Sequence, residues 1–167
     1  MANSMTVAEL HRRVDEQVAP LLALYGGKLH CRKGCSGCCT DDLTVFEVEA
    51  DRIREHYADL LRNGEAHTPG ACAFLNSEGL CRIYEHRPYV CRTQGLPLRW
   101  LEEDEAEDIV EYRDICGLSL DALDPIALDD VHCWLIGPFE EQLNDLQHRT
   151  DRGAMRRVSL RSLFESH

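Results

Sequence analysis

The stretch Cys31-Arg-Lys-Gly-Cys35-Ser-Gly-Cys38-Cys39 holds four of the nine cysteines of this 167-residue chain within nine positions. Ordinary core packing does not require so many thiols so close together. The glycines at positions 34 and 37 let the backbone turn, so several sulfurs can point at one centre. This density is typical of a metal-thiolate site, and we expect the rest of the chain to serve as its scaffold.

The chain is long enough for one domain, residues 1–167, with a hydrophobic core that needs no disulfide bonds. No segment approaches the roughly 18 consecutive apolar residues of a membrane span, and the N-terminus lacks the pattern of an export signal. We therefore expect a cytoplasmic protein. In that reducing compartment an odd number of closely spaced cysteines favours metal binding over disulfide formation.

The formal net charge of −12 argues against binding to nucleic acid. A protein that binds the phosphate backbone normally presents a concentrated face of lysine and arginine, because neutralised phosphates supply most of the affinity. We expect no nucleic-acid partner and no membrane partner, and the sequence identifies no protein partner.

Two amphipathic helices are predicted on either side of the cysteine stretch. The first covers about residues 6–25, where Thr6 and Glu9 form a capping-box pattern and two glycines follow. The second covers about residues 44–62, where Thr44 and Glu47 repeat that pattern. The cysteine stretch is thus expected to lie between two helices.

The rest of the chain predicts mixed structure. Residues 63–95 are rich in glycine and proline and are expected to be irregular, with short strands. Residues 96–101 and 109–112 flank an acidic connector and predict a β-hairpin. Residues 128–148 predict helix, kinked or divided at Gly137-Pro138, and residues 159–164 predict a last helical turn. The expected class is α+β and mainly α, a small single domain of helices and a short hairpin around a cysteine-rich core.

Five cysteines lie outside the opening stretch. Cys72, Cys81 and Cys91 occur in the irregular segment, as expected for ligands carried on loops, and Cys116 follows the hairpin. Cys133 lies in a helical pattern beside a tryptophan, and we interpret it as a buried thiol that packs as a small apolar side chain.

Thiolates are soft ligands that select zinc, copper(I) or iron-sulfur clusters. Neighbouring residues rarely point both side chains at one mononuclear metal. Cys38 and Cys39 therefore serve two centres, bind different irons of a polynuclear centre, or include one buried thiol. Thiolate charge also needs compensation, and five basic residues next to cysteines can supply it: Arg32, Lys33, Arg82, Arg87 and Arg92.

Two enzymatic interpretations rest on weaker signals. The spacing Cys31-x3-Cys35-x2-Cys38 matches the triad of radical S-adenosylmethionine enzymes, but the chain lacks the repeated strand-helix units that normally house that chemistry. His30, His86 and His132 lie near cysteines in the sequence, yet eight histidines make such neighbours common by chance. No catalytic residue can be named from these patterns.

The cysteine pattern resembles the YkgJ-type CxxCxxCC cysteine-cluster family, described as proteins proposed to chelate zinc or iron. The first block corresponds to Cys31 through Cys39, with three residues instead of two after Cys31. The second comprises Cys72-Ala-Phe-Leu and Cys81-Arg-Ile-Tyr-Glu-His-Arg-Pro-Tyr-Val-Cys91-Arg, and Cys116 is the downstream cysteine. Together the matches span residues 31–116.

The resemblance implies eight metal-directed cysteines: Cys31, Cys35, Cys38, Cys39, Cys72, Cys81, Cys91 and Cys116. We expect a cytoplasmic protein that holds an iron-sulfur cluster or zinc through these thiolates and acts in redox chemistry or metal handling. The alternatives are an enzyme that works at an iron-sulfur cluster, by methyl transfer or radical chemistry, and an interaction module with a purely structural zinc.

Overall fold

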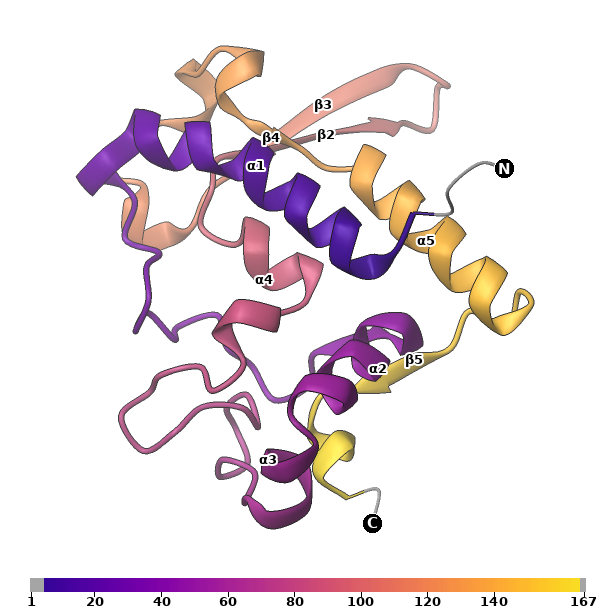
Figure 1. Cartoon of the computed structure of the whole chain (residues 1–167). Coiled ribbons are helices and arrows are strands. Elements are labelled where there is room, and N and C mark those ends of the chain that lie inside the picture. Colours follow the sequence, from indigo (N-terminus) through magenta and orange to yellow (C-terminus); the bar gives the residue numbers. More distant parts are fainter. Residues whose placement is uncertain (1–4, 166–167) are drawn as a thin grey trace.

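The computed structural model describes residues 5–165, and its first long element is helix α1, Val7–Tyr25 (Figure 1). The Thr6 side chain accepts a hydrogen bond from the Glu9 amide at 3.2 Å, which confirms the predicted N-cap. The helix ends at Gly26, as its sequence predicts. Its apolar positions form one buried face that includes Leu10, Val14 and Val18.

The second predicted helix is shorter than expected and divided. Thr44–Phe46 forms strand β1, helix α2 covers Glu47–His56, and helix α3 covers Ala58–Asn63. Thr44 is not an N-cap, because its backbone pairs with a distant strand. The Gln147 side chain instead accepts the Val48 amide hydrogen bond at the start of α2, at 3.0 Å.

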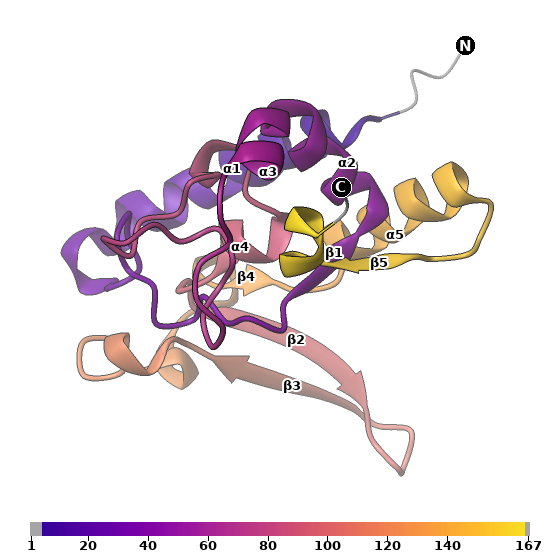
Figure 2. The same ribbon diagram turned by 90° about the horizontal axis from the view of Figure 1, so that it is seen from below.

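The predicted hairpin is present as β2, Leu98–Glu103, and β3, Ile109–Asp114, and it projects from the helices (Figure 2). The helix expected over residues 128–137 is wrong. Residues Trp134–Leu135 form strand β4, which pairs in parallel with β2. The Trp134 amide donates to the Pro97 carbonyl at 2.7 Å, and this pairing keeps the segment extended.

The C-terminal part returns to the N-terminal half. Helix α5, Pro138–Asp151, begins at the predicted proline. Strand β5, Arg157–Ser159, then pairs antiparallel with β1, and a predicted last turn is present as the 3-10 helix η6, Arg161–Phe164. Helices α1 and α5 lie side by side, whereas β5 lies next to α2 (Figure 1).

The middle segment is mostly irregular, as expected, but it contains one short helix, α4, Tyr89–Thr93. A single antiparallel bridge joins Leu75 to Cys81. The remaining 3-10 helices are η1, Gly26–Lys28; η2, Tyr84–His86; η3, Gly117–Ser119; η4, Pro125–Ala127; and η5, Asp130–His132.

Two hydrophobic clusters hold these elements together. One joins α1, α4, α5 and β4, with Tyr89 and Trp134 inside it. The other joins β1, α2, α3 and η6 around Phe74, and it includes Cys72. The α+β, mainly α-helical class is confirmed. Within residues 5–165 no helix is both long enough and apolar enough to cross a membrane.

Candidate metal centre

The first cysteine block forms a run of tight turns between η1 and β1. The Cys35 amide donates to the Arg32 carbonyl at 2.8 Å, and the Cys39 amide donates to the Ser36 carbonyl at 3.0 Å. Gly34 adopts a φ of 95°, which an L side chain rarely adopts. The turns place thiols from both ends of this block along one wall of a pocket.

The second block is attached to the first by a backbone hydrogen bond from the Cys72 amide to the Cys39 carbonyl, at 2.8 Å. The Leu75–Cys81 bridge then turns the chain back, and Cys91 follows on α4. The two blocks, which are more than 30 residues apart in the sequence, therefore bring their thiols to one place.

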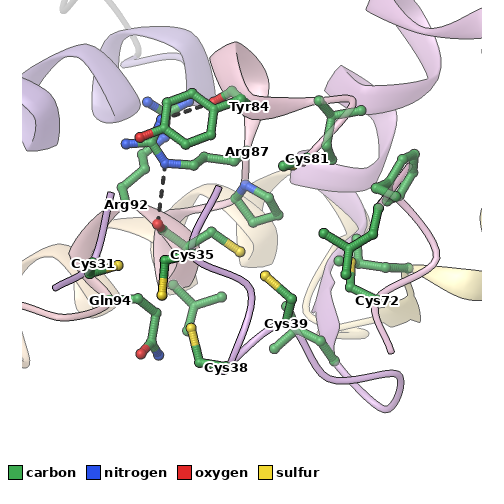
Figure 3. Close-up of a pocket in the computed structure, with 18 of the residues that line it drawn as sticks. Cys31, Cys35, Cys38, Cys39, Cys72, Cys81, Tyr84, Arg87, Arg92 and Gln94 are labelled. Carbon is green, nitrogen blue, oxygen red and sulfur yellow. Dashed lines mark hydrogen bonds between the residues drawn. The ribbon is translucent and has the colours of Figure 1, made fainter. Parts of the chain in front are cut away.

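Seven of the nine cysteines line this pocket, whose cavity has a volume of about 130 Å³. The labelled side chains of the first block lie close together on one side, with Cys72 and Cys81 farther along (Figure 3). The seven are Cys31, Cys35, Cys38, Cys39, Cys72, Cys81 and Cys91. The pocket unites seven of the eight predicted ligands.

Cys116 lies near the same pocket without lining it. Its charge would raise the pKa of the Cys31 and Cys38 thiols, although burial is the larger cause for both. The buried Ser119 connects these segments: its amide donates to the Cys116 carbonyl at 2.7 Å, and its hydroxyl oxygen accepts the His30 amide hydrogen bond at 3.2 Å. Cys116 is thereby held beside the start of the first block.

Comparison with known protein families identifies the chain. The family model CxxCxxCC, described as "Putative zinc- or iron-chelating domain", matches residues 30–117, more than half of the chain. The chain belongs to the CxxCxxCC family. No curated protein and no solved structure matches it.

The donor set of this CxxCxxCC chain fits a soft metal. Thiolates are the ligands that zinc and iron-sulfur centres select. Among residues 5–165, however, no group of three or more Cys, His, Asp or Glu side chains is arranged to hold a metal ion. In the described part of the chain the thiols line one pocket and are not gathered into one coordination sphere.

Burial raises the pKa of six of the seven thiols that line the pocket. It raises the pKa of Cys31 to about 11 and that of Cys39 to about 12, with neighbouring cysteines as the next cause. Burial likewise raises the pKa of Cys91, Cys72 and Cys81. A metal must therefore displace protons from this CxxCxxCC pocket.

Three of the five expected basic residues line the pocket: Arg32, Arg87 and Arg92. Arg87 is fixed by hydrogen bonds from its guanidinium to the Tyr84 carbonyl at 2.9 Å and to the Cys91 carbonyl at 3.2 Å (Figure 3). Its positive charge lowers the pKa of Cys31 and Cys81, against the larger effect of burial. Arg87 is thus positioned to offset thiolate charge.

Several features of the CxxCxxCC pocket have no signal in the cysteine spacing. Gln94 and an apolar wall that includes Leu22, Leu43 and Leu160 line it. Gly95 lies against Cys31, where an added Cβ would stand 2.1 Å from the Cys31 Cβ. In the sequence, this contact is signalled only by the presence of a glycine at position 95, shortly after Cys91 and Arg92.

The other predicted chemical residues lie elsewhere. None of His30, His86 and His132 lines the pocket. Cys133 is buried beyond it, and desolvation raises its pKa despite the nearby charges of Arg113 and Arg99. Its location agrees with its interpretation as a packed thiol outside the ligand set.

Proposed function

We propose that this chain holds an iron-sulfur cluster, in preference to zinc, through the thiolates of the eight cysteines named from the family resemblance. The observation that carries the proposal is the gathering of seven thiols from three segments around one pocket. Cys116 lies beside them and supplies the eighth thiolate.

The number of thiols favours a polynuclear centre. A mononuclear structural zinc site is complete with four ligands. Here both members of the adjacent pair, Cys38 and Cys39, line the pocket together with five further thiols. Its volume of about 130 Å³ is about ten times the roughly 10–15 Å³ that one water needs, which leaves room for more than one metal atom.

The chemical role that fits this centre is electron transfer or metal handling in the cytoplasm. A reducing compartment keeps free thiols available for metal. Arg87 and the buried Arg92 offset part of the negative charge of a thiolate-bound centre, and such charge compensation tunes its potential.

Anaerobic purification followed by metal and sulfide analysis tests this proposal. We expect brown protein with iron, acid-labile sulfide and absorption in the visible range. Colourless protein with stoichiometric zinc would leave the CxxCxxCC site as a structural zinc centre and reject the cluster.

Cys39→Ser and Cys133→Ser form a matched pair for the same measurement. Cys39 lines the pocket and Cys133 does not. We expect Cys39→Ser to lose most of the bound metal and Cys133→Ser to keep it. Equal metal content in both variants would reject the assigned ligand set.

A further inference from the structure

A second pocket is lined by residues of α1, of α2 and of the segment from η2 to α4. Arg92 lines both pockets, so its buried side chain separates them. Its lining includes His11, three arginines, Arg12, Arg52 and Arg92, and three carboxylates, Asp15, Glu16 and Glu85.

His11 contributes a buried ring nitrogen without a partner. Its Nε2 lies 2.8 Å from the Glu49 carboxylate, which also accepts the Tyr89 amide hydrogen bond at 2.7 Å. Its Nδ1 is buried and makes no hydrogen bond. Desolvation lowers the pKa of His11. With the Nε2 proton directed at Glu49, the neutral ring leaves Nδ1 as a buried acceptor in a residue that lines the pocket.

Two guanidinium groups contribute unused donors. Arg52 is half-buried and makes no hydrogen bond or ion pair with any described residue, and its Nε is among the buried atoms without a partner. Arg92 bonds the Asp15 carboxylate at 2.5 Å and the Glu85 carbonyl at 3.0 Å, but its buried Nε also lacks a partner. An unsatisfied buried donor is costly, so a ligand that supplies acceptors is favoured.

Three arginines and three carboxylates line this second pocket, and two of these arginines are paired with carboxylates. Glu16 pairs with Arg12, and Asp15 pairs with Arg92. Glu85 is exposed and makes no ion pair in the described chain. Arg52 is the arginine of this lining whose guanidinium makes no ion pair with a described residue, so its donors remain for an added anion.

We propose that the second pocket binds a small oxyanion that carries a proton, of the chemical class of hydrogenphosphate. Its charged oxygens accept hydrogen bonds from Arg52, with the electrostatic support of Arg92, and its hydroxyl group donates to the Nδ1 of His11. Such a ligand satisfies donors and acceptor together, which a simple chloride ion cannot do. The site requires no particular metal in the thiol pocket.

Isothermal titration of the full chain, purified anaerobically and exchanged into chloride buffer, tests this site with inorganic phosphate. A parallel titration with glycerol 3-phosphate distinguishes a free phosphate from an esterified one. We expect saturable one-to-one binding of at least one of them. Arg52→Gln should weaken it by about tenfold or more, because it removes the charged donor that the anion binds.

Arg62→Gln is the matched control, because it removes the same charge from an exposed position on α3 outside the pocket. It should leave the affinity within about twofold of the parent. Binding that is equally strong in Arg52→Gln, as expected for phosphate held by a bound metal, overturns the proposal. The absence of saturable binding of either probe also overturns it and leaves water as the only occupant.

Discussion

At the scale of single residues, Gly95 packs directly against Cys31, the first candidate ligand in the sequence. Gly95 has a φ of 85°, and a Cβ there would also lie 2.9 Å from the Cys31 sulfur. Gly95→Ala should therefore displace Cys31, reduce metal content and lower the free energy of unfolding by about 1–3 kcal/mol. Denaturant unfolding and metal analysis measure both effects.

Gly27→Ala provides the comparison, because no atom lies within 4 Å of an added Cβ at that position. Its free energy of unfolding should stay within about 0.5 kcal/mol of the parent. A Gly95→Ala protein with the metal content and stability of the parent would show that the close contact between residue 95 and Cys31 is not required for either property.

The buried His11–Glu49 pair should make the stability of the protein depend on pH. Desolvation lowers the pKa of His11 below its usual value of 6.5 in the folded state. At a pH between the lowered pKa of the folded state and 6.5, the unfolded chain binds the proton and the folded chain does not. The free energy of unfolding therefore falls as the pH drops through 6.5. Ring-proton NMR should show His11 titrating below that value.

Glu49→Gln tests the cause of the His11 shift. The carboxylate raises the pKa of His11 through its hydrogen bond and its charge, although burial outweighs both. Removal of the Glu49 carboxylate should lower the titration midpoint of His11 further. A midpoint that rises in Glu49→Gln, or an unshifted His11 in the parent, would contradict this account of the pair.

The gathering of the cysteines at one pocket could be predicted at this scale, because dense cysteines have few other uses. The Gly95–Cys31 contact could not, since it joins residues far apart in the sequence. Arg52 and His11 looked like ordinary residues of amphipathic helices, and the structure was needed to reveal their unpartnered atoms.

At the scale of elements, Arg161 fastens the last 3-10 helix, η6, to the loop before Cys72. Its guanidinium pairs with Asp41 and donates to the carbonyls of His67 at 2.8 Å and Ala71 at 3.0 Å. Arg161→Gln should loosen this loop and speed amide hydrogen exchange there by several-fold. Exchange mass spectrometry resolves the effect by peptide.

Arg149, an exposed residue on α5, provides the control for the contacts that Arg161 makes with this loop. Arg149→Gln makes the same charge change without touching the loop, so exchange around residues 67–72 should match the parent. Uniform acceleration across the whole chain in Arg161→Gln would indicate general destabilisation and would reject a local clamp.

Element prediction succeeded where local signals agreed and failed where a distant partner decided the structure. The cap at Thr6 and the glycine after α1 are local, and both bounds were predicted. Thr44 carries the same local pattern, but pairing with β5 overrides it. Residues 128–137 were assigned to helix because the parallel pairing of Trp134 with Leu98 leaves no periodic trace in the sequence.

At the scale of the whole molecule, metal uptake should be coupled to proton release. Burial raises the pKa of Cys31 to about 11 and that of Cys39 to about 12, so these thiols are protonated at neutral pH before metal binds. Each thiol that becomes a ligand releases a proton, and metal affinity should rise with pH. Zinc titration of the apo-protein in weak buffer with a pH indicator measures this release.

Cys39→Ser should release fewer protons in that titration, and Cys133→Ser should release as many as the parent. Proton release that is the same in all three proteins would contradict binding by the pocket thiols. Chelation should also lower the thermal midpoint of the loaded protein, because metal that binds the folded state stabilises it.

The overall class followed from composition and helical periodicity, and the structure confirms it. The division of the core into two hydrophobic clusters did not follow, because each cluster combines segments from both halves of the chain. Cysteine spacing therefore pointed to the residues that gather at the pocket, but not to the way its walls are assembled.

The pairing of β1 with β5 has a consequence for biosynthesis. All eight candidate ligands leave the ribosome before Arg157–Ser159, whose pairing with Thr44–Phe46 brings Leu160 to the pocket wall. The nascent chain thus exposes its complete set of thiols while the C-terminal wall is still missing. We expect that metal supplied during translation can reach these thiols before the C-terminal segment completes the pocket wall.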